Sequence, residues 1–178
     1  MPIDKERENR LRSSLRQFIS DQNCCSEMAP RVADHLRHCA ADFKIDATSI
    51  QLAWATIPFK EEPTAGCFPC FRTSNTEAGV HTATVVKFTD QPELYVIDTT
   101  IGQFKKGMEG GIQRSDRHFS ADFVVVEAEE WRQILKLKAA WSQLPDISYQ
   151  NDSEIKSTGG IADFLRTVSV QDSTREKH

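Results

Sequence analysis

Apolar residues recur at helical spacing over the first quarter of the chain. Residues 4–20 are predicted to form a charged amphipathic helix, which the turn and cap residues at 20–23 bring to an end. A second helix is predicted from about Cys25 to Phe43, because its apolar positions are spaced by three, four or seven residues. The apolar face of the first helix consists of Leu11, Leu15, Phe18 and Ile19.

Strand-like patterns replace the helical spacing after residue 48. Residues 49–57 alternate in part and are rich in β-forming residues. Turn residues at 89–93 separate two further strands, so these strands are predicted to pair as an antiparallel hairpin. The later strands are predicted at residues 80–88, 94–99 and 123–127, and a helix at 129–142. Residues 58–79 and 105–120 are expected to form long loops.

The order of these elements indicates the fold class. Helices come first, strands follow in meander order, and a helix closes the pattern, which predicts an α+β fold with N-terminal helices packed on a small antiparallel sheet. The 178 residues suit one domain, expected at 1–145 with its core at about 20–135. Residues 146–178 are mostly polar and are expected to form a C-terminal extension with a short helix at 161–168.

Composition narrows the classes of function. The net charge of −4 and a pI of about 5.7 give no basic face for nucleic acid, so no nucleic-acid partner is expected. No apolar run approaches the roughly 20 residues of a membrane span. The charged start of the chain lacks the apolar stretch of a Sec signal peptide. A cytoplasmic location is therefore the default expectation, and delivery to another cell by a non-Sec secretion route stays open.

The hairpin brings a histidine near a carboxylate. If Thr89 and Asp90 form a two-residue turn, His81 faces Asp98 directly; if the turn is one residue later, the two are diagonal neighbours on one face. Neighbours across two strands lie about 5 Å apart. A carboxylate at that distance fixes the tautomer and orientation of an imidazole, which leaves the other ring nitrogen available for chemistry.

A nucleophile is predicted where the second helix begins. Cys24 and Cys25 lie at a turn that leads into this helix, and the partial positive charge of a helix N-terminus favours a thiolate. Pro30 favours Cys25 over Cys24, because proline is accommodated only in the first turn of a helix. Cys25, His81 and Asp98 together would form a thiol-hydrolase triad.

Three segments carry a resemblance to a known superfamily. They are Asn23–Ala29, Gly79–Val86 and Leu94–Phe104, the last with an Asp-x-Thr-x-x-Gln-Phe pattern about 17 residues after the histidine. Their order resembles the papain-like/transglutaminase-like cysteine hydrolases over roughly residues 20–135. Compact members include papain-fold toxin and effector domains of bacteria, several of which are similar to protein glutamine deamidases.

This resemblance implies a catalytic domain in which Cys25 attacks an amide, His81 transfers protons and Asp98 orients His81. It implies a protein substrate, a thioester intermediate, and neither a metal nor an organic cofactor. Glutamine deamidation is favoured, with proteolysis and transglutamination by the same triad as alternatives. Gln22 is the candidate oxyanion donor, and Gln103 belongs to the motif without an assigned role. An activating or inhibitory protein partner is left open.

The remaining cysteines and the tryptophans allow other interpretations. The odd count of five cysteines argues against a simple disulfide framework. Cys67 and Cys70 have the C-x-x-C spacing of half a zinc site or of a redox pair, although no second pair has matching spacing. A non-enzymatic zinc- or thiol-based interaction module is therefore an alternative, as is a hydrolase fold that only binds. Trp54, Trp131 and Trp141 are predicted to be core residues.

Overall fold

The structure, a computed structural model, describes residues 1–22, 24–58, 71–72, 78–108, 121–138 and 143–151. Its helices are α1 (Lys5–Ser14), α2 (Cys25–Cys39) and α3 (Ala128–Lys138), with the 3-10 helices η1 (Arg16–Phe18), η2 (Ala40–Phe43), η3 (Ala47–Ser49) and η4 (Ile101–Met108). Its strands are β1 (Gln51–Pro58), β2 (Phe71–Arg72), β3 (Ala78–Lys87), β4 (Leu94–Asp98), β5 (Val124–Glu127) and β6 (Asp146–Gln150).

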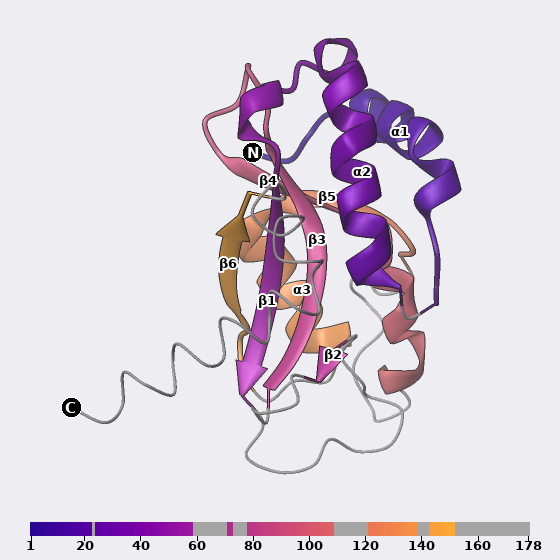
Figure 1. The fold of residues 1–178 in the computed structure, drawn as a ribbon, viewed down its shortest axis with the longest axis vertical. Helices are drawn as coiled ribbons and strands as arrows, with labels where there is room; N and C mark the ends of the chain where they lie inside the picture. Colours follow the sequence, from indigo (N-terminus) through magenta and orange to yellow (C-terminus); the bar gives the residue numbers. More distant parts are fainter. Residues whose placement is uncertain (23, 59–70, 73–77, 109–120, 139–142, 152–178) are drawn as a thin grey trace, which may run out of the picture.

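The described strands form one antiparallel sheet in the order β5-β4-β3-β1-β6, and the short β2 pairs with the beginning of β3 (Figure 1). The long strands β1 and β3 form its centre. The predicted hairpin is present as β3 and β4. The α+β class and the antiparallel sheet predicted from the sequence are therefore confirmed.

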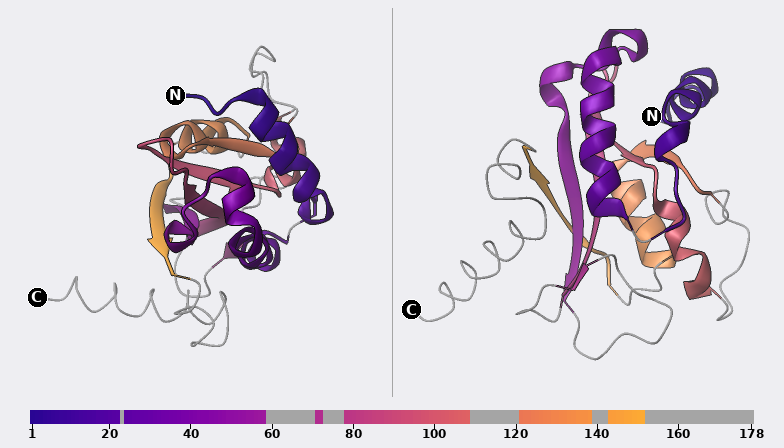
Figure 2. Two further views of the ribbon diagram at one scale, coloured as in Figure 1. Left: turned by 90° about the horizontal axis from the view of Figure 1, so that it is seen from above. Right: turned by 45° about the vertical axis from the view of Figure 1, so that its right-hand side comes forward.

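Helices cover both faces of the sheet (Figure 2). Successive residues of each strand point to opposite faces, so Val86 and Ile97 belong to one core while Val85 and Val96 belong to the other. The first core also contains residues of α1 and α2, and the second contains residues of α3 and η4. The sheet is thus the middle of three layers.

Two elements differ from the sequence-based expectation. Residues 105–108 were predicted as loop but continue η4, whose apolar residues Ile101 and Phe104 pack in the second core. The strand β6 was not predicted, because its mostly exposed residues give no clear apolar pattern; backbone pairing with β1 holds it at the sheet edge. The predicted helix at 161–168 lies outside the described residues.

Proline inside α2 does not end the helix. Pro30 is followed by helical residues as far as Cys39, so the expectation that proline is confined to the first turn is wrong here. The hydroxyl of Thr84 donates to the carbonyl of Ala29, the residue before the proline, at 2.9 Å. This buried hydrogen bond joins α2 to β3 and fixes the position of the helix along the strand.

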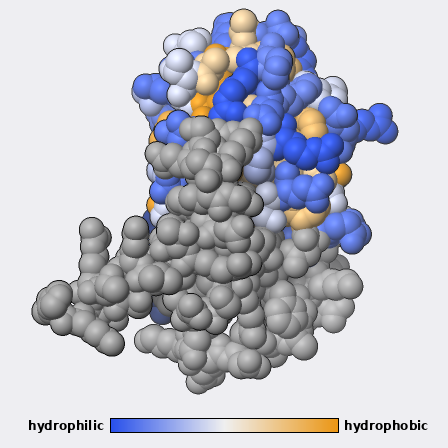
Figure 3. Space-filling model, in the orientation of Figure 1, coloured by the Kyte–Doolittle hydropathy of each residue, from blue (hydrophilic) through white to orange (hydrophobic). Residues whose placement is uncertain are grey.

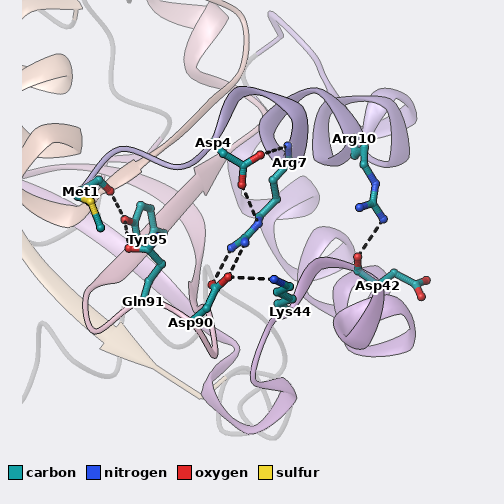
Figure 4. A network of polar contacts seen from close by, with 9 residues as sticks. All are labelled: Met1, Asp4, Arg7, Arg10, Asp42, Lys44, Asp90, Gln91 and Tyr95. Carbon is teal, nitrogen blue, oxygen red and sulfur yellow. Dashed lines mark hydrogen bonds and ion pairs between the residues drawn. The ribbon is translucent and has the colours of Figure 1, made fainter.

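The first helix is attached to the far end of the hairpin by a charged network (Figure 4). Arg7 donates to both carboxylate oxygens of Asp90, at 2.8 and 2.6 Å, and its guanidinium lies over the ring of Phe88. Asp4 caps α1 by accepting from the backbone of Arg7, and Lys44 also reaches Asp90. These contacts hold α1 against the turn between β3 and β4.

The solvent-facing side of α1 is polar. On the face seen in Figure 3, the coloured, described part of the surface is mainly hydrophilic with small scattered hydrophobic areas. Exposed residues of α1 include Lys5, Glu6, Asn9 and Arg10. Among the described residues, no helix is long and apolar enough to cross a membrane.

The contact between β3 and α2 can be tested with a matched pair of substitutions on one strand. Thr84→Val should lower the free energy of unfolding by about 1 kcal/mol, because it removes the hydrogen bond to Ala29 while keeping the shape of the side chain. Thr82→Val should leave stability unchanged or raise it, because the buried Thr82 hydroxyl has no hydrogen-bond partner within the described part of the chain. Urea denaturation of both variants measures the difference, and equal losses would contradict this account.

Candidate active site

His81 and Asp98 meet where the hairpin opens. The strands pair Thr84 with Ile97, which makes His81 and Asp98 diagonal neighbours on one face, the second of the two predicted registers. The β3–β4 ladder ends at this pair, and pairing with β2 resumes at Val80, so His81 lies between the two ladders. The two side chains are fully buried, and Nε2 of His81 donates to Oδ2 of Asp98 at 2.6 Å.

The carboxylate of Asp98 is held by three elements. Its Oδ1 accepts from the backbone N–H of Thr100 at 2.9 Å and from the Thr100 hydroxyl at 3.3 Å, a local turn that begins η4. Its Oδ2 accepts from His81 of β3 and from the indole N–H of Trp131 of α3, the latter at 2.9 Å. Each carboxylate oxygen thus accepts two hydrogen bonds, which fixes the orientation of Asp98.

Cys25 is the first residue of α2, and its side chain is buried. It forms a side-chain hydrogen bond with His81. Because Nε2 of the ring is bound to Asp98, Nδ1 is the nitrogen left for Cys25. The structure therefore brings the three predicted residues Cys25, His81 and Asp98 into one continuous chain of hydrogen bonds.

Backbone contacts position the loop that precedes Cys25. The N–H of Ser20 donates to the carbonyl of Thr99 at 3.0 Å, so this loop runs beside the residue that follows Asp98. Gly102 lies close by, and a Cβ atom there would be 3.3 Å from the Cα of Asp122 and 3.7 Å from the Cβ of Asp21. A side chain here would have to displace a neighbour by a few tenths of an ångström, so Gly102 allows η4 to pack closely against Asp122 and the loop before α2.

The environment of the site shifts the pKa values of His81 and Asp98 in opposite directions. Burial alone lowers the pKa of His81, but the charge and hydrogen bond of Asp98, followed by the hydrogen bond and charge of Cys25, raise it to about 10. Burial raises the pKa of Asp98, but the charge of His81 and the hydrogen bonds from His81, Trp131 and Thr100 bring it below its ordinary value. The charged forms of His81 and Asp98 therefore stabilise each other, beside the sulfur of Cys25.

Of the two glutamines considered, Gln103 and Gln22, only Gln103 contacts a residue of the triad. The side-chain amide nitrogen Nε2 of Gln103, on η4, lies 2.8 Å from Nδ1 of His81, the ring nitrogen on the side of Cys25. Gln22, the predicted oxyanion donor, is exposed, and its amide donates to the carboxylate of Asp21 at 3.3 Å. The sequence motif contained Gln103, but no pattern in it showed that its amide would reach the histidine.

The other cysteines lie apart from the triad or outside the described residues. Cys24 is half-buried at the N-cap of α2 and makes no side-chain capping hydrogen bond. Cys39, at the end of α2, donates to the carbonyl of His35. Cys67 and Cys70 fall outside the described residues. Within the described part of the chain, no three histidine, cysteine or acidic side chains are grouped to hold a metal ion.

Comparison with known proteins adds one structural similarity. No protein-family model matches the chain, and no curated protein does. A crystal structure of the C-terminal region of Pasteurella multocida toxin, reported to contain a thiol-protease-like catalytic triad, is similar with a TM-score of 0.47 and 13% sequence identity. The match covers 84% of this chain and 18% of that chain. The function is therefore argued from the geometry of the site.

Two substitutions should lower the pKa of His81 by different amounts. Asp98→Asn should lower it more than Cys25→Ala, because the effect of Asp98 on the ring exceeds that of Cys25. In the wild type the folded pKa of about 10 lies above the ordinary 6.5, so ionised His81 stabilises the fold fully below pH 6.5 and loses this effect as pH rises through 10. NMR titration of the imidazole carbon-bound protons measures the pKa directly. A wild-type midpoint near 6.5 would contradict the charged site.

Proposed function

We propose that this protein is a cysteine-dependent hydrolase of the papain-like/transglutaminase-like kind, with Cys25 as nucleophile, His81 as general acid and base, and Asp98 as the residue that orients His81. The observation that carries the proposal is the buried contact of His81 with both Cys25 and Asp98. A buried histidine with a strongly raised pKa beside a thiol at a helix N-terminus is the arrangement that activates a cysteine.

The chemistry would proceed in two steps. The thiolate of Cys25 attacks the carbonyl carbon of an amide, and His81 gives its Nδ1 proton to the leaving nitrogen, so that ammonia or an amine departs and a thioester remains. Water then attacks the thioester while Nδ1 of His81 removes its proton, which releases a carboxylic acid and restores the Cys25 thiolate beside protonated His81. Asp98 stays ionised throughout and stabilises the imidazolium.

A glutamine side chain of a protein is the favoured substrate. Cys25 and His81 are buried, so the group that reaches the sulfur must be slender. A glutamine amide at the end of two methylene groups fits this requirement better than a peptide bond with substituents on both sides. The same triad could serve a cysteine protease or a transglutaminase, which differ from a deamidase in the bond that is broken or in the acceptor.

The proposed activity bears on the substrate, the route of delivery and the partners of this protein. The sequence resembles papain-fold effector and toxin domains, so a protein substrate and delivery by a non-Sec secretion route fit the function; the domain predicted at 1–145 extends to include β6 of the sheet. An activating or inhibitory protein partner is compatible with such an enzyme. A zinc- or thiol-based interaction module would instead depend on Cys67 and Cys70, and replacing these two would then remove bound zinc.

Thiol reactivity provides the first test. Limiting iodoacetamide at about pH 6 should label Cys25 much faster than the other four cysteines, because an ordinary thiol with a pKa near 8.5 is almost wholly protonated there. His81→Ala should abolish the fast labelling. His35→Ala is a matched control, because His35 lies on α2 in contact with Ser14 and should leave the labelling unchanged. Slow, uniform labelling of all five cysteines in the wild type would exclude the activated thiol.

The leaving group separates the possible activities. With benzyloxycarbonyl-glutaminyl-glycine as the probe, a deamidase should release ammonia without cleaving the peptide bond, and Cys25→Ala should abolish this release. Cleavage of the backbone would favour a protease. Incorporation of an added primary amine would favour a transglutaminase.

The two glutamines can be compared directly as oxyanion donors. Gln103→Ala should lower kcat about 100-fold or more, because its amide lies beside the ring nitrogen that faces Cys25 and a lost oxyanion donor has an effect of this size. Gln22→Ala should have little effect, because its exposed amide contacts Asp21. Steady-state kinetics with the same probe measures both effects. A larger loss of kcat in the Gln22 variant than in the Gln103 variant would contradict the assignment of Gln103 as the oxyanion donor.

A further inference from the structure

Trp131 approaches the site from the face of the sheet opposite α2. It lies in the first turn of α3, and its side chain is fully buried in the second core. Its ring lies 5.9 Å from the ring of His81, and its indole N–H donates to Oδ2 of Asp98 at 2.9 Å. A tryptophan predicted as ordinary core thus contacts two members of the triad.

The indole hydrogen bond completes the coordination of the carboxylate. A carboxylate has about four lone-pair positions. At Asp98 they are used by His81 and Trp131 on Oδ2 and by the N–H and hydroxyl of Thr100 on Oδ1. Protonation of Asp98 would therefore require one of these hydrogen bonds to break. Trp131 shares the oxygen that faces His81, so its loss would open a position on that oxygen.

A comparison with Phe104 separates packing from hydrogen bonding. Phe104 also packs against His81, edge to face with ring centres 4.9 Å apart, but its ring has no hydrogen-bond donor. The indole of Trp131 is a donor only, so it can bind the ionised carboxylate but cannot take up or release its proton. A residue needed for packing alone would not have to direct a donor at Oδ2.

We propose that Trp131 is a positioning residue of the triad, whose indole N–H keeps Asp98 ionised and holds Oδ2 toward His81. This rests on the proposed function, because positioning has a catalytic effect only if His81 transfers protons. The titratable groups that face Asp98 are His81 from β3 and, beyond it, Cys25 from α2. In the described residues, α3 and η4 present Trp131 and Gln103, which are uncharged.

The kinetic test compares Trp131→Phe with Phe104→Leu, using ammonia release from benzyloxycarbonyl-glutaminyl-glycine. Trp131→Phe should lower kcat about tenfold with little change in KM, and should move the acid limb of the pH–rate profile upward by about one unit, because Asp98 then protonates more readily. Phe104→Leu alters packing around the same imidazole and should leave the acid limb in place. An unshifted acid limb in a folded Trp131→Phe variant would overturn the proposal.

A second measurement needs neither activity nor folding of the Trp131 variant. In the wild type, the indole N–H signal of Trp131 in ¹⁵N NMR spectra should shift with the same midpoint as the ring of His81, because both donate to Oδ2. Asp98→Asn should move the indole signal upfield and weaken this coupling. An indole signal that shifts neither with the titration of His81 nor on Asp98→Asn substitution would overturn the proposal.

Ammonia release and the indole signal together distinguish a failure of the proposed hydrolase function from a failure of the proposed role of Trp131. If Cys25→Ala and wild type both release no ammonia while the indole signal follows His81, the proposed function fails but the hydrogen-bonded positioning of Asp98 stands. If ammonia release depends on Cys25 while Trp131→Phe shows the wild-type acid limb, the enzyme stands and the role of Trp131 fails.

Discussion

The buried carboxylate of Asp98 is the constraint on which the rest of the site depends. An ionised carboxylate without solvent costs several kcal/mol unless charges and hydrogen bonds compensate for the lost water. Here the compensation comes from His81 on β3, Thr100 at the start of η4, and Trp131 on α3. Because each donor belongs to a different element, the sheet, η4 and α3 must all be correctly placed before the charge is stable.

The position of the nucleophile depends on a separate set of contacts. Cys25 belongs to a helix of the first core, whereas His81 packs against the aromatic rings of Phe104 and Trp131 in the second core. The two side chains meet where β4 leaves β3, between the last β4 pair and the first β2 pair. Thr84 fixes α2 on β3, and the Ser20–Thr99 hydrogen bond fixes the preceding loop. The site therefore joins the two layers of helices at the place where strand pairing along one side of β3 is interrupted.

This arrangement separates the reacting groups from the groups that support them. Nδ1 of His81 faces the side of Cys25 and Gln103, while Nε2 faces Asp98 and the indole of Trp131. A proton can leave or return at Nδ1 while the contacts at Nε2 remain unchanged. The raised pKa of His81 and the lowered pKa of Asp98 express the same fact, since each charge is stabilised by the other.

The sequence by itself determined the α+β class, the β3–β4 hairpin, the beginning of α2 at Cys25 and the proximity of His81 to Asp98. These features follow from local periodicity, turn residues and strand register, which act over a few residues. The tertiary structure alone decided that Gln103 contacts His81, that Trp131 binds Asp98 and that the polar strand β6 joins β1. Those contacts depend on how η4, α3 and the sheet edge pack, and the spacing of apolar residues along the chain does not specify which polar atom of a buried side chain will meet which partner.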